Sequence, residues 1–148
     1  MNPQTLDHAG IAARVPHSGS MCLLHSVRRW SAECIECTAR SHANLANPLR
    51  TPGGLLSTNA IEYAAQAMAL HGSLCAAPGT PPTPGFLASV RAVTLHVQRL
   101  DDIAGDLNIA VSLLAGDTRQ ALYTFTLHDD AGRLLVDGRA TVVLKAPP

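Results

Sequence analysis

The sequence predicts an α+β fold in which one long central helix is wrapped by a curved antiparallel β-sheet. Residues 57–70 are rich in strong helix formers and are apolar over most of the helix circumference. Several runs in which polar and apolar residues alternate follow this segment, as expected of half-buried strands. A helix that is apolar on several sides must be buried on several sides, and one sheet can bury it only by curling around it.

The helix is expected over residues 57–70, with Gly72 as its C-cap. Glu62 is the only carboxylate in this segment and lies in its first turn, where the helix dipole stabilises an anion. Asn59 and Glu62 also have the spacing of a capping box, in which the carboxylate accepts a hydrogen bond from a free backbone N–H. The spacing alone therefore leaves two interpretations of Glu62, a structural cap and a functional acid.

Two strands are expected before the helix and four after it. A turn near residues 31–32 joins the first two, and a proline-rich loop over residues 75–85 follows the helix. A sheet with one covered face has unpaired edges, so we expect edge-to-edge assembly into a homodimer or heterodimer. The expected strands are residues 21–30, 33–39, 93–98, 107–113, 123–128 and 133–144.

Length and composition limit the class of protein. A chain of 148 residues with 47% hydrophobic content fits one compact domain over residues 1–148. Eleven basic and eleven acidic residues are interleaved without a block of like charge, which argues against a nucleic-acid partner. No stretch approaches the ~18 apolar residues of a membrane span, and the first residues do not resemble a signal peptide. We expect a cytoplasmic protein with no membrane partner, whose four cysteines are reduced.

Further residues could carry chemistry. His17 lies in a segment bracketed by proline and glycine that could aim its imidazole at a cleft, and His42 lies in a second loop. The glycine pair that ends at Gly54 could let backbone N–H groups approach a ligand carbonyl near the helix N-terminus. Cys34 and Cys37 have the spacing of a metal pair, but they stand alone in a strand-like run, so no metal site is expected.

Three segments of the chain resemble a known family. They are VPHSGSMCLL at residues 15–24, AIEYAAQA at residues 60–67 and GFLASVR at residues 85–91. Together they resemble hot-dog-fold 3-hydroxyacyl-[acyl-carrier-protein] dehydratases, and most closely the dehydratase-like proteins of aryl polyene biosynthesis clusters. The likeness covers a core of about residues 10–145 and implies the hot-dog fold.

The resemblance implies a dimer with acyl tunnels that needs no cofactor. In such a site a histidine of one subunit removes the proton α to the thioester, and an acid of the other protonates the leaving hydroxyl. The resemblance makes Glu62 and His17 the candidate catalytic residues, and Gly54, Asn47 and Phe86 the candidate substrate-binding residues. The implied partner is an acyl thioester carried by acyl carrier protein or coenzyme A.

One position departs from the family pattern. Standard dehydratases carry their histidine about fourteen residues before the acid, and this chain has Pro48 there. Three hypotheses follow: Glu62 serves a histidine of a different hot-dog subunit; His17 or His42 completes the site in a homodimer; or the chain is a non-catalytic module that binds acyl groups or the carrier protein. A hot-dog thioesterase, in which Glu62 orients a water, is a further alternative.

Overall fold

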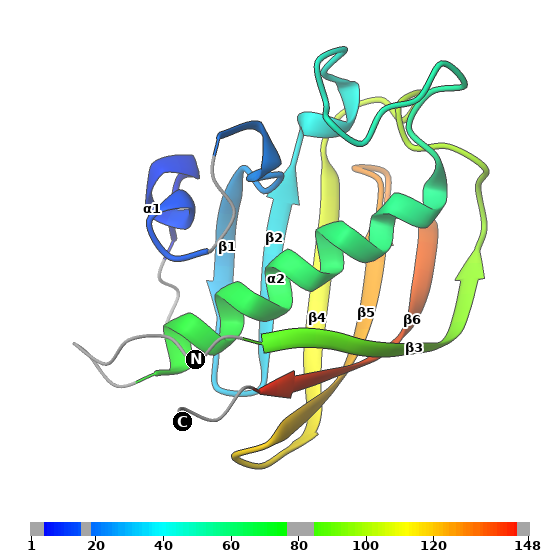
Figure 1. The fold of residues 1–148 in the computed structure, drawn as a ribbon. Helices are drawn as coiled ribbons and strands as arrows, with labels where there is room; N and C mark the ends of the chain where they lie inside the picture. The colour runs from blue at the N-terminus through cyan, green and yellow to red at the C-terminus, as the bar shows by residue number, and fades with distance from the viewer. Residues whose placement is uncertain (1–4, 16–18, 77–84, 145–148) are drawn as a thin grey trace.

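A six-stranded antiparallel sheet curves around one long helix, α2 (Ala60–Cys75), in the computed structural model (Figure 1). The structure describes residues 5–15, 19–76 and 85–144. The sheet order is β1-β2-β4-β5-β6-β3, and the α+β architecture expected from the sequence is confirmed. The strands are β1 Ser26–Trp30, β2 Cys34–Ala39, β3 Gly85–Leu95, β4 Leu107–Gly116, β5 Gln120–His128 and β6 Leu134–Leu144. Shorter helices are α1 His8–Ala12, η1 Gly19–Met21, η2 Ser41–Ala43 and η3 Ser57–Asn59.

The central helix is displaced toward the C-terminus relative to its expected range. The 3₁₀ turn η3 occupies its expected start, and the α-helix runs past Gly72 instead of ending there. Gly72 is exposed, so its missing side chain removes no core contact, and a glycine inside a helix costs only about 1 kcal/mol. Leu74, in the added turn, packs against the core, which favours the longer helix.

The expected capping box does not form. Asn59 is itself in a helical conformation and makes no side-chain cap. Its side-chain amide donates to the carbonyl of Leu56, and its backbone N–H donates to the same carbonyl. Because η3 already uses this backbone donor, the interpretation of Glu62 as the second half of a capping box is wrong.

The helix buries a face of small residues against the sheet. Ala60, Ala64 and Ala67 are fully buried, and His71 on the same face is buried with them. His71 is a satisfied core histidine: its Nδ1 accepts from the Tyr123 hydroxyl at 3.0 Å, and its Nε2 donates to a backbone carbonyl at 2.9 Å. Burial lowers the pKa of His71, so the imidazole is held in its neutral form.

The segment before β1 differs from its expected strand. Residues 21–30 were expected to pair throughout, whereas the ladder begins only at Ser26. Leu23 and Leu24 are buried in the core instead, and the side chain of Gln66 satisfies the backbone near them. A long-range side chain therefore replaces the ladder hydrogen bonds that a strand would have made.

β3 is longer and more exposed than the half-buried strand expected over residues 93–98. It pairs with β6 alone, at the edge of the sheet, and all of its residues are exposed or only partly buried. Two register shifts interrupt the pairing, and Ala92 lies at the second with a φ of 51°. The alternating polar and apolar residues of β3 therefore do not mark a half-buried strand, because the rest of the chain covers little of it.

β4 and β5 extend beyond their expected ranges, and β2 and β6 match theirs to within one residue. In β5 the odd-numbered residues Tyr123, Phe125 and Leu127 are buried, and the residues between them face away from the core. The four cysteines are free thiols. Within the described ranges there is no helix long and apolar enough to cross a membrane, and no cluster of three or more metal-ligating side chains.

Candidate active site

Glu62 lies half-buried in the first turn of α2, at the position that the sequence singles out. One turn further along, Gln66 donates from its Nε2 to the Oε1 of Glu62 at 3.4 Å. Residues four apart lie on the same side of a helix, so the carboxylate and the amide share one face. The arrangement gives the carboxylate a neighbour that the core holds in place.

Gln66 is fully buried and ties the helix to the segment that precedes β1. The backbone N–H of Leu23 donates to its Oε1 at 2.9 Å, and its Nε2 donates to the carbonyl of Met21 at 2.7 Å. This role of Gln66 does not follow from the local sequence. The available signal was a lone amide in an apolar helix, which must find partners when it is buried.

A second network of polar side chains surrounds Tyr63, the residue after Glu62. Ser41 donates its hydroxyl to the carbonyl of Leu23 at 2.8 Å, so it accepts from the Tyr63 hydroxyl at 2.8 Å. The Tyr63 oxygen in turn accepts from Nδ2 of Asn47 at 3.1 Å. Burial raises the pKa of Tyr63, so its hydroxyl keeps its proton and can act as this donor.

Asn47, a candidate substrate-binding residue, has its side chain engaged within the protein. Its Nδ2 donates to the carbonyl of Ser41 at 2.9 Å as well as to Tyr63, and its Oδ1 accepts from the N–H of Leu49 at 2.9 Å. Asn47 therefore fixes the loop that precedes the helix. Its observed contacts are structural ones.

Gly54, the second candidate for substrate binding, allows two loops to approach closely. Its φ is +102°, and a Cβ at this position would lie 2.5 Å from a carboxylate oxygen of Asp101. The N–H of Gly54 donates to the carbonyl of Thr51, so it is already used within a turn. The next N–H, that of Leu55, donates to Oδ1 of Asp101 at 2.9 Å.

Asp101 anchors the loop that leads into α2. Its side chain is almost fully buried and accepts from Leu55 and from the guanidinium of Arg99. The hydrogen bond from Arg99 holds the pKa of the Asp101 carboxyl well below its usual range. The charged form of this residue is therefore the form that the folded state requires.

Replacing Asp101 by asparagine is expected to destabilise the protein at neutral pH and to have a smaller effect in acid. A carboxyl whose pKa is lowered on folding stabilises the protein above its unfolded pKa of about 3.9, and this contribution is lost as the pH falls through the folded pKa. The gap in thermal midpoint between wild type and Asp101→Asn should narrow steadily below about pH 4. Asp102→Asn is the matched control, because that neighbouring carboxylate is exposed. A gap that is unchanged with pH would contradict the assignment.

Of the two candidate histidines, the structure describes only His42. His17 lies outside the described residues. His42 is fully buried in η2, and its Nε2 donates to the carbonyl of Ile103 at 3.0 Å. Its Nδ1 has no hydrogen-bond partner within the described part of the chain. No hydrogen bond of the His42 ring reaches α2, and the ring is anchored to the loop between β3 and β4.

Phe86, the third candidate for substrate binding, lies on β3 and is 57% exposed. Its register partner on β6 is Val143, which is also exposed, so the pair faces away from the core. Phe86 is therefore available to a partner at the edge of the sheet. Within the single chain the structure does not bring it to Glu62.

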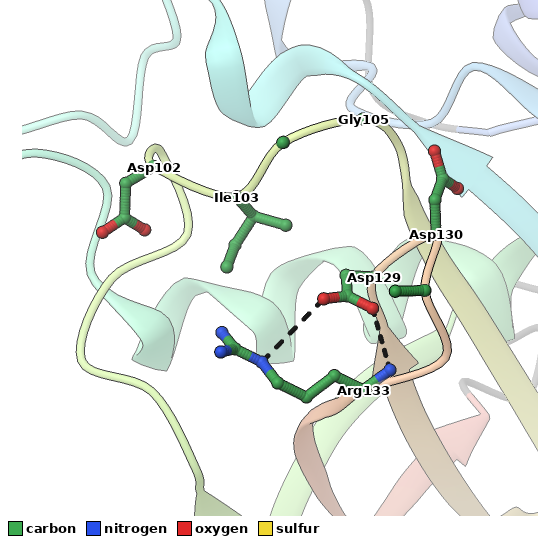
Figure 2. Close-up of a pocket in the computed structure, with 8 residues that line it drawn as sticks. Asp102, Ile103, Gly105, Asp129, Asp130 and Arg133 are labelled. Atoms are coloured by element: carbon green, nitrogen blue, oxygen red, sulfur yellow. Dashed lines mark hydrogen bonds and ion pairs between the residues drawn. The ribbon is translucent and has the colours of Figure 1, made fainter.

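A surface hollow lies between the β3–β4 loop and the β5–β6 turn (Figure 2). Arg133 pairs with Asp129 at 3.9 Å across its rim. Asp130 accepts from the backbone N–H of Asp106 and from the amide of Asn108. The polar groups of this hollow stabilise the β5–β6 turn, and no residue of α2 lines it. The hollow is therefore not the candidate active site, which is the first turn of α2 around Glu62.

A helix held in a curled antiparallel sheet defines the hot-dog fold, and solved structures support this. A chain of the dehydratase heterocomplex ApeI:P from Xenorhabdus doucetiae is 24% identical, with a TM-score of 0.79 over 92% of this chain and 91% of that one. The thioesterase HI1161 from Haemophilus influenzae is 14% identical, with a TM-score of 0.67 over 97% and 93%. A mutant of the thioesterase PA1618 from Pseudomonas aeruginosa is 16% identical, with a TM-score of 0.67 over 95% of each chain.

A family model matches nearly the whole chain. Residues 9–146 match the ApeP-like family, described as ApeP dehydratase. The chain belongs to this dehydratase family, which confirms the resemblance inferred from the sequence. No curated protein matches the chain.

Proposed function

We propose that this chain supplies the acid of a 3-hydroxyacyl-thioester dehydratase site and that a second hot-dog subunit supplies the base. The observation that carries the proposal is Glu62, a carboxylate in the first turn of an apolar helix, flanked by the buried groups of Tyr63 and Gln66. Pro48 stands where standard dehydratases have a histidine. Membership of a dehydratase family supports water elimination as the reaction.

The chemistry is a 1,2-elimination of water, in which the C2–H bond and the C3–O bond both break. The base takes a proton from C2 of the thioester, and the electron pair of that C–H bond forms the C2–C3 double bond. The protonated carboxyl of Glu62 gives its proton to the hydroxyl on C3, which leaves as water. The products are an enoyl thioester and water, and a proton returned from the base to Glu62 completes the cycle.

The β3 edge is where we propose that the partner subunit adds. The opposite edge is shielded, because Leu6 exchanges two backbone hydrogen bonds with Val27 of β1 and α1 lies beside that strand (Figure 1). β3 has eleven residues, and its edge is exposed and apolar at Phe86, Leu87 and Val90. A long apolar edge of this kind promotes aggregation unless another strand covers it. That one solved relative is described as a heterocomplex supports a different hot-dog subunit as that strand's source.

Thioester hydrolysis is the second candidate, because several of the structurally similar proteins are described as thioesterases. In that reaction Glu62 would orient a water toward the thioester carbonyl. The two reactions use the same substrate class and give different products, an enoyl thioester or a free acid. Product analysis therefore separates them.

The test is to purify the tagged chain from its native host with any hot-dog subunit bound to it, and to supply a 3-hydroxyacyl thioester on acyl carrier protein. The proposal predicts an enoyl thioester that forms without release of free acid. Free acid as the main product would favour the thioesterase. No product, together with a rise in thermal midpoint on adding the acyl carrier protein, would indicate a binding module instead.

A further inference from the structure

We propose that Arg91 and Arg139 select the partner at the β3 edge. They oppose pairing of this chain with a second copy of itself, and they favour a hot-dog subunit whose facing strand carries acidic side chains. This inference rests on the proposed function, in which β3 meets a second subunit. It goes beyond that function because it states which chemistry the partner strand must have.

The two arginines are direct register partners on β3 and β6, and both are exposed. Like charges directly opposite each other on neighbouring strands are destabilising. Within the described part of the chain, neither guanidinium has a carboxylate within ion-pair distance. Carboxylates pair with five of the ten arginines, whereas Arg14, Arg28 and Arg119 share the lack of an ion pair among the described residues, but only Arg91 and Arg139 also lie directly opposite each other.

Both arginines lie on the face of the sheet opposite to α2. Arg139 is the register partner of Thr124, an even-numbered residue of β5, and the even-numbered side of β5 faces away from the core. The next residue, Ala140, points the other way and is buried. The unpaired charges therefore lie on the outer face, within reach of side chains on a strand added to β3.

Carboxylates on this part of the sheet are already committed to other groups. Asp137 accepts from the imidazole of His96 at 2.8 Å. Asp117 accepts from the backbone N–H groups of Arg119 and Gln120 in the β4–β5 turn. Asp117 lines the same hollow as Arg91 and Arg139 but forms no ion pair with either, so a paired counter-ion would come from outside the described chain.

Pairing with a second copy would concentrate positive charge. In a symmetric antiparallel pairing with full overlap, the middle residue Val90 faces Val90 of the second copy, and Arg91 faces Ser89. The two copies of Arg91 are then diagonal neighbours, about 7–8 Å apart at Cα. With Arg139 on the next strand of each copy, four guanidinium groups would lie across four adjacent strands, each within about 8 Å at Cα of its nearest neighbour, which is the screening length at physiological salt.

A different subunit with aspartate or glutamate on that face would relieve this repulsion. Arginine binds carboxylates through two parallel hydrogen bonds, so each acid would gain orientation as well as charge neutralisation. The apolar residues Phe86, Leu87 and Val90 would provide contact area for either partner. The charges would decide between partners, as like-charge contacts do at specific interfaces.

The first test measures self-association of the purified chain by sedimentation equilibrium. Arg91→Glu places a carboxylate opposite Arg139 and leaves no net charge on the pair, so this variant should dimerise with a Kd at least about tenfold lower than that of wild type. Arg139→Glu makes the same change from the other strand. Arg28→Glu is the matched control, because Arg28 is exposed on β1 at the opposite edge, and it should leave the Kd unchanged.

The second test uses a charge-reversed copy of the chain, Arg91→Glu/Arg139→Glu, as a probe for an acidic edge. Mixed with wild type, it should form a heterodimer at least about tenfold tighter than either chain's self-association, and the difference should shrink near 1 M salt. A wild-type chain that dimerises tightly on its own, or variants that associate no differently from Arg28→Glu, would overturn the inference. Neither result bears on the reaction, which the product analysis tests separately.

Discussion

Replacing Glu62 by glutamine is expected to lower kcat for water loss from a 3-hydroxyacyl thioester by about 10²–10⁴-fold in the assembled enzyme. Glutamine keeps the length and shape of the side chain and can still meet Gln66, but it has no acidic proton to give to the leaving hydroxyl. Substrate binding should change less than turnover, because the site keeps its shape. Rapid-quench measurement of enoyl thioester formation gives kcat and KM separately.

The matched control for this substitution is Glu33→Gln. Glu33 is an exposed carboxylate in the turn between β1 and β2, where it accepts from the hydroxyl of Ser31. Its neutralisation changes the net charge by the same amount and should leave kcat unchanged. Full activity in Glu62→Gln would remove the basis for treating this residue as the acid.

Replacing Gln66 by leucine is expected to destabilise the protein by about 2–4 kcal/mol. The N–H of Leu23 and the carbonyl of Met21 would lose their partner, and each unsatisfied buried group costs about 1–3 kcal/mol. Urea unfolding measures the difference in the free energy of unfolding between the variant and wild type, provided that the two m-values agree. Because Gln66 also contacts Glu62, the variant should lose turnover in the folded enzyme as well as stability.

Gln120→Leu is the control for the stability measurement. Gln120 is exposed on β5, and a surface substitution of this kind usually changes the free energy of unfolding by less than about 0.5 kcal/mol. A Gln66→Leu variant as stable as Gln120→Leu would show that the segment before β1 does not depend on the buried amide.

Periodic patterns made most of the fold predictable. The alternation in residues 107–113, 123–128 and 133–144 located β4, β5 and β6, because each of these strands has neighbours on both sides or a face on the core. The concentration of strong helix formers in residues 57–70 identified α2, although not its ends. The same alternation in β3 gave the wrong burial, since a pattern does not state whether a strand lies at an edge.

Features set by distant contacts could not be predicted. Gln66 meets Leu23 across 43 positions, and the bonds of Asn47 and Tyr63 depend on a loop conformation that no local pattern encodes. The failed capping box has the same origin, because the 3₁₀ turn before α2 is held by pairing with the loop near Asp101. For the site, spacing left Glu62 open between two roles, and the family resemblance favoured the acid.

We propose that the active site is divided between this chain and a second hot-dog subunit. The most direct measurement compares turnover of a 3-hydroxyacyl thioester on acyl carrier protein by the purified chain alone and by the complex isolated from the native host. We expect the chain alone to be slower by at least about 10²-fold, the contribution of a missing general base, and to recover when the partner is added back. A chain that turns over alone at the rate of the complex would contradict the claim.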